Sequence, residues 1–494
     1  MKTKGAALLP GSAARRRAVA TTVLAAVLCS LAWLAGSLVT ADPAHAASKG
    51  IVDWRLEMPE GISDLSTVPA IVEEMGPGKL QARWTRVYAR WARLQPVAPG
   101  ETSAADVDGD GYDDAYVAEL DAVIGAFRAR GINVIVTCTD CPEWASDRQY
   151  WTGGYDSDVV MKIADVTVRA EFQRFARFLA LRYGPFGVRH FEVWNEPNLN
   201  SGLDPQLVGA AKTPVGPAVY LKMLKTFYAG ARLGNSKAVI IAGATSRRGA
   251  NDDNSTSPQW FARYLKSKGA GRYFNAYSHH PYTPPGSNPR PSAPPRLPKT
   301  MVGLGNIDTL LKIFPTKPFY LTEYGYSTGT VDAFCVTVSE ADQARYMRQA
   351  YALVARKSQI KVLLWFLVAD WAPNPEKPES GIYSGLVGTD GLRKPGWYAF
   401  AGGNRLTLTG PASAAAGVSF DLSGSLTTRV GALADVTLTL QSRSPSGTTW
   451  SKVATTTTAA DGSFAVTARQ SKSRVYRVIW NGVCESKGKR VVMP

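Results

Sequence analysis

Two glutamates, Glu196 and Glu323, each come directly after a short apolar run of the sequence. Glu196 lies in Phe-Glu-Val-Trp-Asn-Glu-Pro-Asn, residues 191–198, and Glu323 lies in Phe-Tyr-Leu-Thr-Glu-Tyr-Gly, residues 319–325. Two carboxyl groups about 5 Å apart can cleave a glycosidic bond with retention, because one protonates the leaving oxygen while the other attacks the anomeric carbon. This chemistry requires a fold that brings the two glutamates together, although they are far apart in the sequence. The predicted strands and helices therefore decide whether the two residues can act as a pair.

Short apolar or β-branched runs alternate with longer amphipathic stretches between residues 50 and 400, which is typical of repeated strand–helix units. The expected strands are 51–57, 82–89, 132–137, 190–194, 238–242, 275–278, 318–322 and 361–368. Expected helices include 116–128, 170–181, 219–233 and 340–355. This order predicts an α/β fold, a (β/α)8 TIM barrel over residues 47–403. Strands four and seven face each other across the barrel mouth, so Glu196 and Glu323 are expected to meet there.

The composition changes near residue 405. The chain becomes rich in Thr, Ser and Val, and the alternating runs 435–441, 463–468 and 475–480 are separated by Pro-Ser-Gly and Asp-Gly turns. Residues 404–494 are therefore expected to form a small all-β domain. Its pattern resembles the immunoglobulin-like sandwich modules attached to many secreted bacterial enzymes.

The N-terminus has the pattern of an export signal. A basic front of Lys2, Lys4 and residues 15–17 precedes an apolar segment over 18–41 and the small-x-small site at 44–46. We expect a signal peptide over 1–46 and a secreted, extracellular protein. Because the apolar segment is longer than a usual signal core, an uncleaved anchor at the cell surface is the alternative; after cleavage, no stable membrane insertion is expected.

The chain is basic, with a formal net charge of +16, and residues 404–494 hold eleven Lys and Arg against four Asp and Glu. Nucleic acid is not expected as a partner, since no basic helix or aromatic-interleaved RNA motif is present. For an exported protein, the basic C-terminal domain favours contact with an anionic cell-surface polymer. The alternative is a solvated basic surface without a partner.

Four cysteines follow the signal segment: Cys138, Cys141, Cys335 and Cys484. An even number in an exported chain favours disulfides, and the pairs 138–141 and 335–484 are one of three connectivities. A zinc site would need a second Cys-x-x-Cys or a nearby His. The acidic run 106–111 begins like a calcium loop, but Val117 occupies the twelfth position, so a turn is expected instead. No metal and no cofactor are expected.

The Trp-Asn-Glu-Pro run after strand four and the Thr-Glu-Tyr-Gly run after strand seven resemble clan A of the retaining glycoside hydrolases, over about residues 51–400. Within that clan, the runs 194–199, 280–282 and 385–398 are most similar to family 39 and its exopolysaccharide-degrading relatives, with family 5 next. The resemblance implies a secreted enzyme that hydrolyses β-glycosidic bonds of a polysaccharide or oligosaccharide. It implies Glu196 as acid/base, Glu323 as nucleophile and Asn195 as the residue that bonds the sugar 2-hydroxyl.

The same resemblance implies four supporting residues. Arg86 would keep the nucleophile ionised, and Tyr282, next to His280, would donate a hydrogen bond to it. Trp365 would form an aromatic floor under the sugar. A structural ion pair is the alternative for Arg86, and plain core is the alternative for Trp365. The rival function is a non-catalytic carbohydrate- or cell-wall-binding protein on a degenerate barrel, and the presence of both glutamates with their helpers counts against it.

Overall fold

The computed structural model describes residues 47–53, 56, 65–147, 161–296, 299–329, 335–372 and 381–494. The predicted signal segment, residues 1–46, lies outside them. No helix within these ranges is long and apolar enough to cross a membrane.

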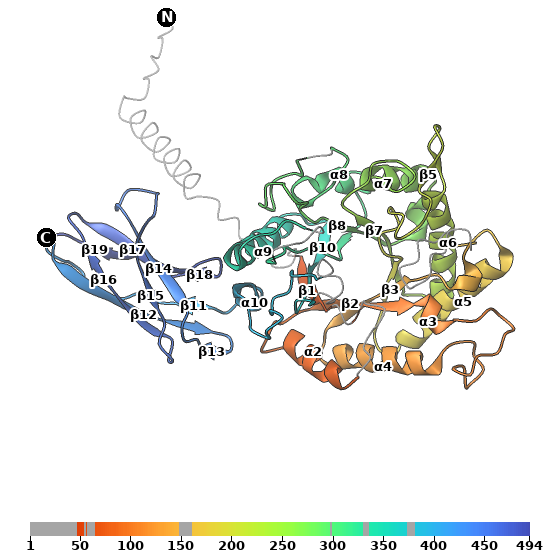
Figure 1. The fold of residues 1–494 in the computed structure, drawn as a ribbon, viewed down its shortest axis with the longest axis horizontal. Coiled ribbons are helices and arrows are strands. Elements are labelled where there is room, and N and C mark those ends of the chain that lie inside the picture. The colour runs from red at the N-terminus through yellow and green to blue at the C-terminus, as the bar shows by residue number, and fades with distance from the viewer. Residues whose placement is uncertain are drawn as a thin grey trace, which may run out of the picture. The chain divides into compact units, whose positions relative to one another are not determined.

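Eight parallel strands close a barrel in the order β1-β10-β9-β8-β7-β4-β3-β2 (Figure 1). They are β1 (Ser48–Val52), β2 (Trp84–Arg90), β3 (Asn133–Thr139), β4 (His190–Val193), β7 (Val239–Ser246), β8 (Ala276–His280), β9 (Phe319–Leu321) and β10 (Ile360–Phe366). The predicted barrel is confirmed. The first strand differs most from its expected range: it ends at Val52 because it pairs with β10, whose last residue, Phe366, lies opposite Val52.

Helices cover the outside of the barrel (Figure 1). They are α2 (Val68–Met75), α3 (Trp91–Leu94), α4 (Asp114–Ala129), α5 (Val166–Tyr183), α6 (Gly216–Gly234), α7 (Pro258–Ser267), α8 (Asp308–Leu311), α9 (Glu340–Val354) and α10 (Pro395–Ala401). The start of α4 follows from a side-chain cap, since Asp113 accepts a hydrogen bond from the Tyr116 amide at 2.9 Å. The acidic run before it therefore ends in the expected turn into a helix.

Side chains of β10 alternate between two apolar clusters. Leu363 and Trp365 belong to the large cluster that includes the helices. Leu364 and Phe366 belong to a smaller cluster with side chains from β1, β3, β7, β8 and β9. A cluster that joins this many strands of a closed barrel lies in its interior, so Phe366 points inward and Trp365 outward.

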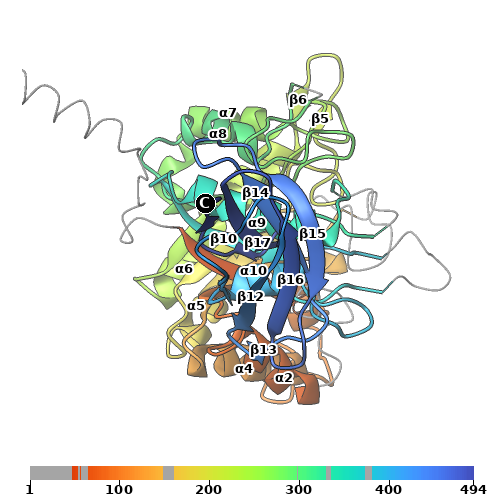
Figure 2. The same cartoon turned by 90° about the vertical axis from the view of Figure 1, so that its left-hand side faces the viewer.

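The chain after residue 404 forms antiparallel sheets (Figure 2). Their strands are β11 (Arg405–Leu406), β12 (Ser419–Thr428), β13 (Gly431–Ala432), β14 (Thr437–Arg443), β15 (Ser451–Thr457), β16 (Ser463–Arg469), β17 (Arg474–Trp480), β18 (Cys484–Glu485) and β19 (Lys489–Val491). Strand β12 pairs with β16, and β14 lies between β15 and β17. Alternate residues of β16 are buried, as the period-two pattern predicted. The all-β prediction is confirmed.

The structure contradicts the predicted disulfides. The described cysteines form none. Cys335 packs beside Tyr282 in the cluster inside the barrel, whereas Cys484 lies on β18 in a C-terminal sheet. Cys138, in β3, and Cys141 are both buried in the large core cluster, and burial raises the pKa of the Cys138 thiol to about 12. An even number of cysteines says nothing about position, which is why the expectation was wrong.

Candidate active site

The two glutamates meet at the C-terminal end of the barrel strands. Glu196 follows β4 by three residues and Glu323 follows β9 by two. One carboxylate oxygen of each glutamate and one ring nitrogen of His280 all lie within 4.8 Å of one another. Retaining glycosidases hold their two carboxyl groups about 5 Å apart, whereas inverting enzymes need a wider gap to admit water. The structure therefore brings the predicted pair together at one end of the barrel.

The turn that carries Glu196 is fixed by several contacts. Trp194 and Glu196 have φ angles of +71° and +40°, in the left-handed region that side chains other than Gly adopt rarely. The indole Nε1 of Trp194 donates to the carbonyl oxygen of Gly202 at 2.8 Å, and the Glu196 amide donates to Ala244 O at 3.0 Å. A strained turn persists only where its surroundings hold it, so the orientation of Glu196 is set by neighbouring elements.

Two hydrogen-bond donors and the ring of His280 surround the carboxylate of Glu323, which is 5% exposed. Arg86 Nη2 donates to Oε1, and the Tyr282 hydroxyl donates to Oε2 at 3.0 Å. His280 Nδ1 lies 3.5 Å from Oε1. The structure thus places the predicted Arg86, His280 and Tyr282 around Glu323, and the hydrogen bonds from Arg86 and Tyr282 fix the orientation of its carboxylate.

Glu196 contacts the same histidine, since His280 Nδ1 lies 3.0 Å from Glu196 Oε1. Burial by itself raises the pKa of Glu196, but the hydrogen bond and charge of His280 and the charge of Arg247 outweigh burial and lower it. Burial lowers the pKa of His280, yet the charges of Glu323 and Glu196 raise it above its ordinary value. Without substrate, Glu196 is therefore held in its ionised form.

A third buried carboxylate, Glu192, supports the site and was missed by the sequence analysis. It lies on β4 and is fully buried. Its Oε1 accepts from Thr322 Oγ1 at 2.9 Å, its Oε2 accepts from Thr137 Oγ1 at 2.9 Å, and Arg86 Nη1 lies 3.5 Å from Oε2. The signal was available, because a charged residue inside an apolar strand must have partners. Glu192 thus contacts one terminal nitrogen of Arg86 while the other donates to Glu323.

Asn195 and His279 differ in whether their polar atoms are available to a ligand. Asn195 is adjacent to Glu196, and its Oδ1 is buried without a hydrogen-bond partner among the described residues, so it can accept from a ligand hydroxyl. His279 has both ring nitrogens engaged, with Thr245 Oγ1 at 2.9 Å and Val302 O at 2.8 Å. Burial lowers the pKa of His279 to about 3. His279 is thus a neutral structural histidine.

The structure does not place Trp365 with this group. Trp365 is fully buried on the outer side of β10, and its indole Nε1 donates to Ser384 O at 3.0 Å. The residue that faces the site is Phe366, which is 8% exposed and whose ring centroid lies 6.3 Å from that of Tyr282. The prediction that Trp365 faces the site was therefore wrong by one position, since Phe366 points inward. Strict alternation along β10, counted from the inward Val362, would have identified Phe366.

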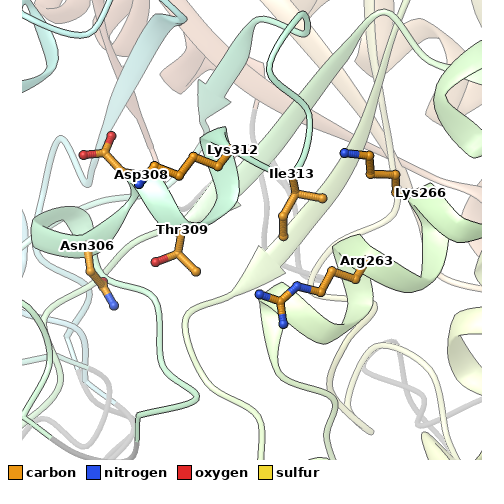
Figure 3. A pocket seen from close by; sticks show the side chains of 7 residues that line it. All are labelled: Arg263, Lys266, Asn306, Asp308, Thr309, Lys312 and Ile313. Carbon is orange, nitrogen blue, oxygen red and sulfur yellow. The ribbon is translucent and has the colours of Figure 1, made fainter.

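A separate hollow of about 570 Å³ lies on the outside of the barrel, between α7 and α8 (Figure 3). Arg263 and Lys266 line it from α7, and Lys312 lines it from the end of α8. Its single carboxylate, Asp308, is bound to Lys357 Nζ at 2.7 and 2.8 Å. This hollow offers cations but no pair of carboxylates, so it provides no second centre for acid–base chemistry.

The two glutamates lie at the C-terminal end of the barrel strands, where enzymes with a (β/α)8 barrel carry their active sites. The model of the cellulase family, glycosyl hydrolase family 5, matches residues 85–370, more than half of the chain. The chain therefore belongs to glycosyl hydrolase family 5, within clan A. The sequence resemblance put family 39 first and family 5 second; clan A is confirmed, and the family 39 assignment is not.

Solved structures of glycosidases are similar to the chain at low identity. A Bacteroides uniformis β-glucuronidase 2 mutant is 10% identical, with a TM-score of 0.43; the alignment covers 91% of this chain but only 45% of that one. A Croceicoccus marinus glucosidase is 12% identical over 86% of this chain and 96% of that one, with a TM-score of 0.44. The catalytic domain of the major endoglucanase of Xanthomonas campestris pv. campestris is 16% identical over 70% and 90%, with a TM-score of 0.39. No curated protein sequence matches.

Proposed function

We propose that this glycoside hydrolase is exported and cleaves β-glycosidic bonds of a polysaccharide or oligosaccharide by double displacement, with Glu196 as acid/base and Glu323 as nucleophile. The observation that carries the proposal is the approach of their carboxylate oxygens to within 4.8 Å. At this distance the anomeric carbon of a sugar fits against Glu323 while the glycosidic oxygen contacts Glu196.

In the first step, Glu323 attacks the anomeric carbon and forms a covalent ester, and Glu196 gives a proton to the departing oxygen. Arg86 and Tyr282 hold the attacking carboxylate in one orientation through its two oxygens. Because the pKa of Glu196 is lowered in the free enzyme, substrate binding has to raise it before Glu196 can donate.

In the second step, Glu196 acts as a base. It takes a proton from the water that attacks the anomeric carbon, and Glu323 leaves as a carboxylate. The negative charge that returns to Glu323 is stabilised by the same donors, Arg86 and Tyr282. Asn195 would bond the 2-hydroxyl of the bound sugar, and Phe366 would replace Trp365 as its aromatic floor.

The remaining assignments are part of the same proposal. Residues 1–46 would direct export, residues 47–403 would form the catalytic domain, and residues 404–494 would form an accessory module of the immunoglobulin-like type. The excess of Lys and Arg in that module supports contact with an anionic cell-surface polymer. Binding of the isolated wild-type protein to polysaccharide without any turnover would instead favour the non-catalytic rival.

The test is Glu323→Gln, assayed on aryl β-glycosides and on a panel of polysaccharides. The amide is nearly isosteric but cannot form the ester, so turnover should be lost while thermal unfolding stays close to that of the wild type. Glu340→Gln is the matched control, because Glu340 is exposed at the start of α9. Substantial turnover by pure Glu323→Gln, or equal loss in Glu340→Gln, would refute the nucleophile assignment.

A further inference from the structure

We propose that Arg247 binds an oxyanion, a carboxylate or a sulfate, on the sugar next to the bond that is cleaved, and that the enzyme selects acidic polysaccharides. Arg247 directly follows β7, at the same end of the barrel as Glu196 and Glu323. The inference rests on the proposed function, because it names the class of substrate for the same site.

Arg247 is a buried cation that forms no direct ion pair with a described residue. It is 7% exposed, and its Nε has no hydrogen-bond partner in the part of the chain that the structure describes. No described carboxylate lies within 4.0 Å of its guanidinium group, whereas the other buried arginines at this end, Arg86 and Arg90, both form ion pairs. Leaving a buried charge unpaired costs several kcal/mol. A buried arginine without an ion-pair partner contributes little to stability, but it can bind an anionic ligand strongly.

The surroundings of Arg247 place its charge at the reacting atoms. Its positive charge lowers the pKa of Glu196, and it interacts electrostatically with Tyr282 and Cys335, which pack together inside the barrel. Tyr282 is the donor to Glu323. Arg247 therefore lies near Glu196 and near Tyr282, the residue that donates to Glu323.

Hydrogen bonds fix the backbone on both sides of Arg247. Asn198, in the turn that carries Glu196, accepts from the Ser246 amide at 2.7 Å and donates to Arg248 O at 2.9 Å. The carbonyl of Arg247 itself accepts from the Val302 amide at 2.9 Å. The guanidinium is thus presented from a fixed position relative to Glu196, as a recognition residue requires.

An anion is favoured over a neutral hydroxyl for two reasons. The guanidinium fork matches the two oxygens of a carboxylate or sulfate, and only a negative group offsets the buried charge. Neutralising Arg247 would also remove one of the charges that lower the pKa of Glu196, alongside His280, so Glu196 could take up the proton that it must donate. Binding of an acidic sugar and readiness for catalysis would then be linked.

The test uses one polysaccharide backbone in three charge states: chondroitin sulfate, desulfated chondroitin and carboxyl-reduced chondroitin, with glucuronoxylan and its carboxyl-reduced form as a second backbone. Arg247→Gln should lower kcat/KM on the acidic forms about 10- to 100-fold relative to the forms that carry neither sulfate nor carboxylate, whose own kcat/KM should not fall, because loss of this charge lets Glu196 hold its proton more readily. Arg248→Gln is the matched control, since Arg248 is the exposed neighbour, and should alter neither. If the preference of the wild-type enzyme for the acidic form disappears on desulfation, the group that Arg247 binds is a sulfate. If it disappears only on carboxyl reduction, the group is a carboxylate.

Binding is measured in parallel by calorimetry in the Glu323→Gln background, so the outcome does not depend on turnover. Tighter binding of the acidic forms that disappears in Glu323→Gln/Arg247→Gln supports the inference, even if the proposed reaction is wrong. Equal losses on acidic and neutral forms, or no preference for acidic forms in the wild-type protein, would overturn it. Absence of turnover in wild type with selective binding intact would count against the proposed function alone.

Discussion

Tyr282→Phe removes one hydroxyl group from the carboxylate of Glu323. The hydroxyl donates to Oε2 at 3.0 Å, and Tyr282 is 1% exposed, so no bulk water replaces the lost donor. During glycosylation the negative charge on Glu323 decreases, whereas during deglycosylation it returns. The missing hydrogen bond should therefore slow the second step more than the first, and the glycosyl-enzyme should accumulate.

The size of the effect follows from the bond. A hydrogen bond to a charged group contributes about 1.5–3 kcal/mol, and about 1.4 kcal/mol corresponds to a factor of ten in rate. The deglycosylation rate should fall about 10- to 150-fold. Since Arg86 still donates to Oε1, the loss should remain smaller than that of Glu323→Gln.

The assay is stopped-flow release of the aryl group from an activated aryl glycoside. A burst followed by a slow steady state is expected, with kcat and KM both lowered and kcat/KM changed little. Tyr112→Phe is the matched control, because the Tyr112 hydroxyl is buried without a hydrogen-bond partner among the described residues. Unchanged kcat, or a fall in kcat/KM without a burst, would show that Tyr282 does not serve the departing carboxylate.

Glu196→Ala should react slowly with poor leaving groups, whereas azide should restore turnover of an activated aryl glycoside and give a glycosyl azide with the substrate's own anomeric configuration. NMR that shows the opposite anomer would mean that the two glutamates have exchanged roles. Burial lowers the pKa of His279 to about 3, so the folded state keeps the ring neutral while the unfolded chain takes up a proton near pH 6.5. The free energy of unfolding should decrease by up to about 1.4 kcal/mol per pH unit as the pH falls from 6.5 towards 3, and His279→Asn should flatten this slope in denaturant titrations; equal slopes in both proteins would contradict the assignment.

The sequence by itself determined the barrel and its reactive pair. The strand ranges are set by local apolar runs, and the closed order of parallel strands follows from alternating strands and helices. Once the barrel is known, the ends of its strands meet at one face, so Glu196 and Glu323 had to approach each other. Arg86 and Tyr282 were assigned through the resemblance to clan A, and the structure places both next to Glu323.

Only the tertiary structure decided which side chains face inward and which groups lack partners. Trp365 and Phe366 are neighbours in sequence, and a shift of one residue along β10 moves a side chain from the core behind the strand to the site. Glu192 became part of the site through Thr137 on β3 and Thr322, which directly follows β9. Among the described residues Arg247 Nε has no hydrogen-bond partner, and this is equally invisible in sequence, because a missing partner is a property of three-dimensional surroundings and not of any local pattern.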